Sequence, residues 1–246
     1  VSASPDSTII RASSLPQFPD CPRRYAARSF SDDVKAAGFT LSKNRASIGA
    51  AIGTGTHAAL AHAFEKRMEG SEASRESITQ HAVEAIDAAI SDGVVWDDTT
   101  TNPATAHKQA IRQAVAVLQV MGHRINPVAV EEAMEAGLGD GFRLSGHLDI
   151  READAIVDIK TGTVQRANQS QYGAYSLLAE ANGHRVSRLT EIYVKRVGPT
   201  RPQPDPIQSD YPVADCQQDA WQIIQAIKAA VMRFRETGSE WEFIAN

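Results

Sequence analysis

At Pro127 the spacing of apolar residues changes from the period of a helix to the two-residue period of a strand. Alanine-rich segments before this point predict helices at residues 57–70, 74–89 and 104–121. Three short segments after it, separated by Gly or acidic turn residues, predict a meander of strands at residues 128–138, 142–152 and 155–162. The chain is therefore expected to combine a helical first half with a β-sheet.

The remaining segments complete this pattern. Residues 13–30 predict a turn and a helix anchored by Tyr25 and Phe30, and residues 1–12 are expected to be a flexible terminus. The later segments predict a helix at 168–181, a strand at 188–197, a proline-rich loop at 199–212 and an amphipathic helix at 214–236. The apolar side of that last helix is expected to carry Trp221, Ile224, Ile227, Val231 and Phe234.

We predict an α/β fold in which a mixed central sheet of four or five strands is flanked by helices. Residues 13–246 are expected to form a single domain. Its parts are a mainly helical segment at 13–125, a sheet and helix at 126–198, and a loop and helix at 199–246. With 246 residues and 42% hydrophobic content, the chain can bury a full core.

Composition limits the classes of protein. No segment approaches the about 20 apolar residues of a membrane span, and the first residues lack a secretory signal, so we expect an intracellular protein, cytoplasmic in a bacterial or phage-infected cell. The net charge of −5 does not suit a passive DNA coat but allows carboxylates that hold cations. Cys21 and Cys216 are too few for a disulfide framework and are expected to be reduced thiols.

Two polar residues interrupt the apolar strand at residues 155–162. Asp158 and Lys160 are two positions apart, so both side chains project from one face of the strand. If Ala153 and Asp154 form a two-residue turn, Arg151 pairs with Ile156 and Asp149 with Asp158, which brings two carboxylates face to face. A positive charge must then lie between them.

The same register places apolar residues together on the opposite face of the two strands. This apolar layer is a second observation in support of the register. The members of this layer would be Leu148, Ile150, Val157 and Ile159. Spacing alone leaves a simpler interpretation open, because Lys160 could neutralise one carboxylate as a plain salt bridge. The surrounding motifs distinguish the two interpretations.

Five motifs follow one another in a fixed order along the chain. They are S-x-L…C-P-R-R-Y at residues 13–25, T-G-T-H at 54–57, G-H-L-D at 146–149, D-I-K-T-G at 158–162 and Q-Y-G-A-Y at 171–175. With these motifs the chain resembles the PD-(D/E)XK nuclease superfamily, in its RecB-like exonuclease branch. The resemblance implies a restriction-endonuclease-like core.

The resemblance also implies a metal site. Its ligands would be His57, Asp149, Asp158 and the main-chain carbonyl of Ile159, and Lys160 would position or activate the attacking water. Such donors suit one or two Mg²⁺ or Mn²⁺ ions, which polarise the scissile phosphate, and a nearby metal ion helps the lysine to lose its proton. An iron–sulfur cluster, found in part of the family, is not expected, because Cys216 stands alone near the carboxyl end.

Gln171 and Tyr175 share one face of the predicted helix at 168–181. The resemblance implies a role in bracing the site or in gripping DNA, and the alternative is a surface amide beside a core aromatic residue. Thr54 or Thr56 is expected to cap the helix that carries His57, with the neighbouring glycines shaping its entry. Acidic residues of the first strand could add a ligand, but a solvated face is favoured for Glu131, Glu132 and Glu135.

Basic residues are the candidates for DNA contacts. The principal candidates are Arg23, Arg24 and Tyr25, together with Gln171 and Tyr175. Further candidates are Arg28, Lys43, Arg45, Arg185, Arg188, Lys195 and Arg196. Such contacts fix the position of DNA without selecting its sequence.

These observations predict a metal-dependent deoxyribonuclease, an exonuclease acting on DNA ends in recombination, repair or phage DNA processing. Its partners would be DNA and a recombination or replication protein. If His57 binds the metal, the helical half must cover the site. The alternative among enzymes is a structure- or site-specific DNA endonuclease. The alternative outside enzymes is an inactive nuclease-like domain that binds DNA or protein.

Overall fold

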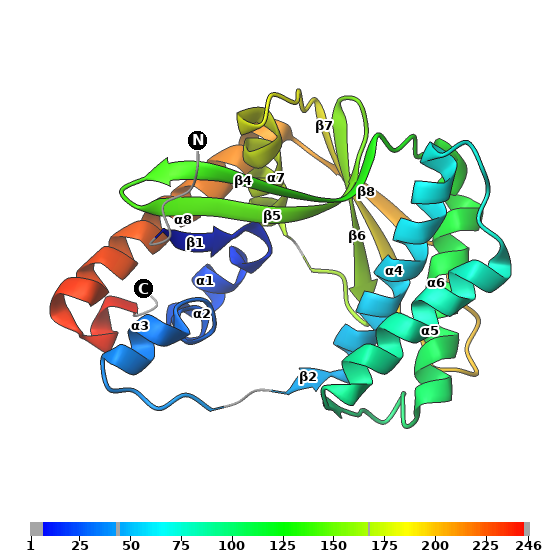
Figure 1. Cartoon of the computed structure of the whole chain (residues 1–246), viewed down its shortest axis with the longest axis horizontal. Helices are drawn as coiled ribbons and strands as arrows, with labels where there is room; N and C mark the ends of the chain where they lie inside the picture. The colour runs from blue at the N-terminus through cyan, green and yellow to red at the C-terminus, as the bar shows by residue number, and fades with distance from the viewer. Residues whose placement is uncertain (1–6, 43–44, 167, 244–246) are drawn as a thin grey trace.

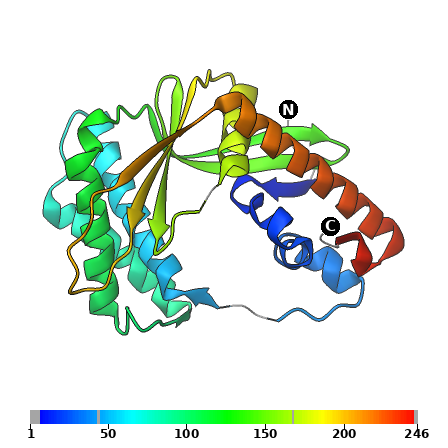
Figure 2. The ribbon, with the colours of Figure 1, turned by 180° about the vertical axis from the view of Figure 1, so that it is seen from behind.

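A mixed β-sheet lies at the centre of the protein, between two groups of helices (Figures 1 and 2). The computed structural model describes residues 7–42, 45–166 and 168–243. The sheet strands are β1 (Thr8–Arg11), β4 (Ala129–Gly139), β5 (Phe142–Arg151), β6 (Ala155–Gly162), β7 (Arg188–Lys195) and β8 (Ile207–Tyr211). The expected meander is confirmed as β4, β5 and β6.

Strand β5 has different partners along one of its edges. Its other edge pairs with antiparallel β4 over most of its length. On the divided edge, parallel β1 pairs with residues 142–145 and antiparallel β6 pairs only with Ile150 and Arg151. The sheet continues from β6 to parallel β7 and antiparallel β8. Residues 146–149, which carry the G-H-L-D motif, therefore lie where the sheet opens.

Two of the six strands come from segments for which no strand was predicted. The expectation of a flexible terminus at residues 1–12 is wrong for Thr8–Arg11, because β1 buries Ile10 completely; residues 1–6 lie outside the described part. The predicted loop at 199–212 contains β8, whose five residues lie between Pro206 and Pro212. Proline cannot donate to a sheet ladder, so it confines β8 to this short segment at the sheet edge.

One face of the sheet is covered by α4 (Ile48–Met68), α5 (Arg75–Ser91) and α6 (Pro103–Val120). Their apolar residues pack against the side chains of Val157, Ile159 and Ile192. The short strands β2 (Ala46–Ser47) and β3 (Val94–Val95) pair beside the start of α4. The helices predicted at 57–70, 74–89 and 104–121 are thus confirmed in number and order, although the first begins earlier.

The other face is covered by α7 (Gln169–Ala181), α8 (Val213–Thr237) and the short helices α1 (Gln17–Asp20), α2 (Pro22–Ser29) and α3 (Ser31–Ala36). Tyr25 and Phe30 are buried there, as expected. Four of the five residues expected on the apolar side of α8 are buried, namely Ile224, Ile227, Val231 and Phe234. Trp221 is the exception, because 48% of it is exposed.

The predicted apolar layer is divided between the two faces. Ile150, Val157 and Ile159 pack with α4 and α6, whereas Leu148 packs in the cluster that contains α7 and α8. Across from Leu148 and Ile150, Glu131 of β4 has a φ of 48°. A non-glycine residue with positive φ interrupts the regular geometry of β4 at the place where the layer divides.

No helix in the described ranges is long and apolar enough to cross a membrane. Both cysteines are free thiols, as the sequence predicted. Cys21 is partly exposed, and Cys216 is buried in α8. Burial raises the pKa of the Cys216 thiol to about 11, so this cysteine has a structural position in the contact between helices.

Candidate active site

Helix α4 begins more than two turns before His57. Ser47 is its N-cap, and the hydroxyl accepts a hydrogen bond from the Ala50 amide at 3.2 Å. The expectation that Thr54 or Thr56 caps the helix is wrong. Their hydroxyls donate to carbonyls four residues earlier inside the helix, at 3.2 Å and 2.9 Å.

The glycines of α4 allow close packing on two sides of the helix. A Cβ atom at Gly55 would lie 2.5 Å from Cγ1 of Ile86 in α5. A Cβ atom at Gly53 would lie 2.8 Å from Oγ1 of Thr161 in β6. The glycines therefore bring α4 against both α5 and the sheet, and the expectation that they merely shape the helix entry is wrong. This packing places His57 over the sheet.

The sheet register agrees with the predicted turn near its end. Arg151 pairs with Ile156, as predicted, and Ile150 pairs with Val157. The ladder then stops, so Asp149 and Asp158 do not form a ladder pair. Instead, Oδ2 of Asp149 accepts a hydrogen bond from the Ile159 amide at 2.7 Å. Where β5 and β6 separate, the Asp149 carboxylate thus takes the place of the backbone carbonyl that would accept this hydrogen bond in a continued ladder.

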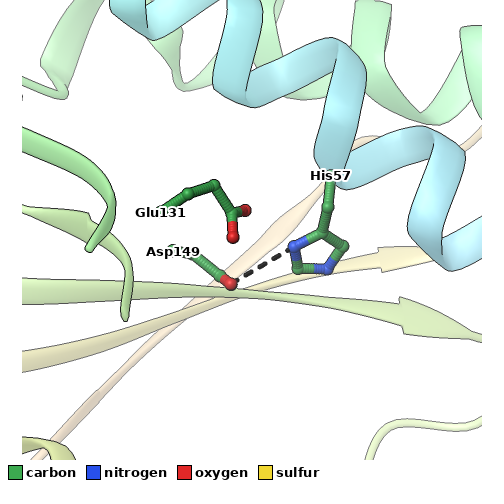
Figure 3. A group of neighbouring side chains, drawn as sticks. All are labelled: His57, Glu131 and Asp149. Atoms are coloured by element: carbon green, nitrogen blue, oxygen red, sulfur yellow. Dashed lines mark ion pairs between the residues drawn. The ribbon is translucent and has the colours of Figure 1, made fainter. Parts of the chain in front are cut away.

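Three side chains from different elements meet at this opening (Figure 3). His57 points from α4 toward the sheet, and its Nδ1 lies 3.3 Å from Oδ1 of Asp149. Glu131 of β4 completes the group, in which one donor atom from each residue lies within 4.8 Å of the others. His57, remote in sequence, thus lies over the carboxylates.

Glu131 takes the less favoured of the two positions that the sequence left open for it, because it lies among the candidate metal donors. A solvated face was favoured for Glu131, and this is wrong, because its charge acts on both Asp149 and His57. All three glutamates also form ion pairs, Glu131 with His147, Glu132 with Arg151 and Glu135 with Arg143. Glu131 alone among them belongs to the group of candidate metal donors. Glu131 lies between Val130 and Glu132, which pair with Ile150 and Leu148, so it is level with Asp149 across the β4–β5 ladder. The turn at residues 139–141 could not have predicted this position, because the register shifts between Gly137 and Gly139.

The donor set fits a divalent cation. One imidazole nitrogen and carboxylate oxygens from two residues can converge on a single ion. Carboxylates are the preferred ligands of Mg²⁺ and Mn²⁺, and imidazole also suits Mn²⁺. Of the residues predicted to bind the metal, the structure brings His57 and Asp149 together. The Ile159 peptide lies beside them through its hydrogen bond to Asp149.

Asp158 lies next to this group but pairs with Lys160. Their Oδ2 and Nζ atoms are 2.7 Å apart, and only 2% of the Asp158 side chain is exposed. Burial raises the pKa of Asp158 to about 7, with Lys160 opposing the shift and Asp149 adding to it. Burial would lower the pKa of Lys160, but the charges of Asp158 and Asp149 raise it above its usual value. Asp158 is therefore paired with the lysine and lies close enough to Asp149 and His57 for their charges to act on it.

His57 and Asp149 each stabilise the charged form of the other. Burial would lower the pKa of His57, but Asp149, followed by Asp158 and Glu131, raises it to about 9. Burial would raise the pKa of Asp149, but His57 and Lys160 hold it below its usual value. Burial and the charge of Asp149 raise the pKa of Glu131. The concentration of acidic groups at this point is what a cation would neutralise.

Gln171 and Tyr175 lie beneath the site within α7. The Gln171 amide donates to the Tyr175 hydroxyl at 2.7 Å, and both residues are buried. The alternative of a surface amide is therefore wrong. Burial raises the pKa of Tyr175, and the charges of Asp158 and Asp149 add to this shift. The geometry fits bracing of the carboxylates, because neither side chain is exposed enough to grip DNA.

A cleft of about 940 Å³ opens beside the three donors. His57, Glu131 and Lys160 line it, together with residues of α4 and of the segment between β6 and α7. Arg166 and Arg196 also line it, and Arg196 forms an ion pair with Asp97 at 2.7 Å. The candidate metal donors and the lysine therefore share one opening to solvent.

The predicted DNA contacts on α2 do not lie in this cleft. Arg23 lines a separate pocket of about 170 Å³, and Arg24 forms an ion pair with Asp20. Tyr25 is fully buried against the rings of Phe18 and Phe30, so its predicted contact with DNA is wrong. Lys43, another predicted contact, lies outside the described residues.

The family model of the PD-(D/E)XK nuclease superfamily matches residues 11–240. The chain belongs to this superfamily, so it is a nuclease-type hydrolase, and the family implies DNA as its substrate. Members of the superfamily use divalent metal ions, in agreement with the donor set.

The fold is also that of a solved structure. The protein named "Putative exonuclease" from Eubacterium rectale superposes with a TM-score of 0.60 and 13% identity, over 95% of this chain and 83% of that one. This likeness supports the restriction-endonuclease-like fold. SSO0001 aligns over 91% of this chain and 78% of that one, with 15% identity, but its TM-score of 0.36 is too low to support an argument. No curated protein matches this chain.

We expect millimolar Mn²⁺ to raise the melting temperature of the wild-type protein. A cation that binds only the folded state stabilises it by about 2.7 kcal/mol at a hundred times its Kd. Asp149→Asn should lose most of this gain, and Asp158→Asn a large part of it. A thermal-shift titration measures the effect, with Asp87→Asn on the surface of α5 as the control. A wild-type protein that does not respond to Mn²⁺ would contradict the shared metal site.

Proposed function

We propose that this chain is a metal-dependent deoxyribonuclease that hydrolyses phosphodiester bonds from a free DNA end. The main observation in support is the convergence of His57, Glu131 and Asp149 beside the buried Asp158–Lys160 pair, at the base of one cleft. The motif order favours the RecB-like branch, and recombination, repair or phage DNA processing as the setting. A recombination or replication protein is the partner we expect.

In this proposal Asp149, Glu131 and His57 hold Mg²⁺ or Mn²⁺, and Asp158 and the Ile159 carbonyl join them when a cation is bound. The cation, when bound, polarises the scissile phosphate and offsets the charge of the leaving oxygen. His57 must be neutral to serve as a ligand, so the proton favoured by its raised pKa leaves when the cation binds.

Lys160 has a separate role. Its side chain is 26% exposed and lines the cleft, so its ammonium group can contact a water molecule that approaches the phosphate. The adjacent Asp158 fixes the lysine head by an ion pair at 2.7 Å. We propose that Lys160 orients the attacking water. Beside a bound cation the lysine loses its proton to solvent more readily, after which the neutral amine could accept a proton from that water. Gln171 and Tyr175 hold the carboxylates in place from below.

The position of α4 supports a preference for DNA ends. The helix packs against β6 and places His57 beside Glu131 and Asp149, so it forms one wall of the cleft that Lys160 also lines. The middle of a duplex would have to pass α4 to reach the lysine, whereas the end of a strand can enter the cleft. Arg166 and Arg196 are the candidates for phosphate contacts within the cleft, in place of Arg23 and Arg24.

The decisive experiment compares initial cleavage rates on a covalently closed circle and on the same DNA after linearisation. We expect a strong preference for the linear form in the presence of Mg²⁺ or Mn²⁺. Equal rates would reject the exonuclease proposal and favour a structure- or site-specific endonuclease. No cleavage of either substrate, together with retained DNA binding, would favour an inactive nuclease-like binding domain.

A further inference from the structure

A buried glutamate lies beside the catalytic pair. Glu191 of β7 is fully buried and is the register partner of Asp158 in the parallel β6–β7 ladder. Its Oε1 accepts a hydrogen bond from the Gln165 amide at 2.6 Å, and its Oε2 accepts one from the Tyr172 hydroxyl. The two groups that donate hydrogen bonds to this carboxylate are therefore both neutral.

Burial of a carboxylate is unfavourable unless a positive charge or several hydrogen bonds compensate for it. The positive charge that interacts with Glu191 is that of Lys160. Tyr172 contacts both residues, because its hydroxyl bonds to Glu191 and its ring lies under the lysine ammonium group. The lysine Nζ lies 5.8 Å from the centre of that ring, within the range of a cation–π contact. The ring is held in turn by the hydroxyl bond to Glu191 and by contact with Tyr211.

We infer that Glu191 is a positioning residue for Lys160, which it holds through Tyr172 while Asp158 serves the metal site. This inference rests on the proposed nuclease function. Asp158 is the only ion-pair partner of Lys160 within the described ranges, and it also adjoins the metal donors. When Asp158 binds a cation, its ion pair with Lys160 is weakened, so Lys160 needs another negative charge to keep its position. Glu191 supplies that charge from beyond the ring, where it does not contact the cation.

Glu191 also connects the lysine to the wall of the cleft. Gln165 belongs to the segment between β6 and α7, whose residues Thr163, Val164 and Arg166 line the opening. Asn168 at the end of this segment donates to the Tyr172 hydroxyl at 3.5 Å. The Glu191 carboxylate therefore holds both the Tyr172 ring beside Lys160 and the segment that borders the cleft.

The first test is Glu191→Gln, which keeps the shape of the side chain and removes its charge. Because a buried charge is costly, this variant should be at least as stable as the wild type. We nevertheless expect kcat to fall about tenfold, with KM for DNA within about twofold. Glu152→Gln is the matched control, because Glu152 is a buried carboxylate paired with Arg188 away from the site. A Glu191→Gln variant with wild-type kcat would overturn the inference.

The second test asks whether Glu191 acts through Lys160. Affinity for Mn²⁺, measured by thermal shift, should fall in Glu191→Gln, because a less compensated lysine competes more strongly for Asp158. In a Lys160→Met background the same substitution should have no effect on Mn²⁺ affinity. An equal loss of Mn²⁺ affinity in the wild-type and Lys160→Met backgrounds, or no loss in either, would overturn the inference. If Glu191→Gln does not fold, Tyr172→Phe, which keeps the ring and removes the donor, replaces it in both tests with the same expected direction.

The outcomes separate this inference from the proposed function. A wild-type protein that neither responds to Mn²⁺ nor cleaves DNA would contradict the proposed function itself. An active wild-type protein whose Glu191→Gln variant matches it in kcat and in Mn²⁺ affinity would contradict only the role of Glu191.

Discussion

Replacement of Lys160 by alanine is expected to lower the rate of DNA cleavage about 10²- to 10⁴-fold, the contribution typical of a side chain that exchanges a proton in the transition state. Lys160 lines the cleft and pairs with Asp158 at 2.7 Å, so it is the basic side chain best placed to contact the attacking water. The metal donors of His57, Glu131 and Asp149 are not altered, so the Mn²⁺-dependent rise in melting temperature should persist.

Two further variants make this prediction specific. Lys160→Met fills the space of the lysine and should be as inactive as Lys160→Ala, which excludes a cavity as the cause. Lys66→Ala removes a surface lysine that pairs with Glu69 on the same helix as His57, and it should retain full activity. Single-turnover cleavage of end-labelled DNA is the measurement. Near-normal turnover in Lys160→Met would refute the assignment.

Gly173→Ala is expected to cause the largest loss of stability of any single methyl addition at a glycine in the described helices. A Cβ atom at Gly173 would lie 1.8 Å from the main-chain oxygen of Cys216, so α7 and α8 would have to move apart. Overpacking of this kind costs about 3 kcal/mol, a fall in melting temperature of about 6 to 12 °C for a chain of this size. The neighbouring Gln171, Tyr172 and Tyr175 should shift with α7, so activity should also fall.

The control for this prediction is Gly198→Ala, because a Cβ atom there would meet no atom within 4 Å. Thermal unfolding monitored by circular dichroism measures both variants. A Gly173→Ala protein that melts within about 2 °C of the wild type would show that the contact between α7 and α8 is looser than the structure indicates, since such a shift is less than about 1 kcal/mol.

The expected elements were most accurate where local periodicity decided the structure. The meander and the helix at 169–181 have the predicted order, and the pairing of Arg151 with Ile156 has the predicted register. A short turn between adjacent strands sets the register directly, because few residues separate the paired positions. The family resemblance then connected Asp158 and Lys160 with a nuclease.

The missed features depend on contacts between distant segments. The strand Thr8–Arg11 forms because β5 offers it an edge more than 130 residues later in the sequence. Tyr25 was expected to contact DNA, but three-dimensional packing buries it beneath Phe18 and Phe30. A pattern of charges and apolar residues cannot distinguish an exposed arginine in a cleft from one beside a separate pocket.

The sequence by itself determined that Asp158 and Lys160 share one face of a strand, because the two-residue period of a strand requires it. It also determined that Asp149 lies on the adjacent strand, because the short turn between the strands sets their register. The family resemblance named His57, but only the tertiary structure placed it over them through α4. The tertiary structure alone also brought in Glu131, from the irregular part of β4, and Glu191, through the parallel crossover to β7. Each of these positions depends on packing between segments far apart in the chain, and local periodicity carries no information about such packing.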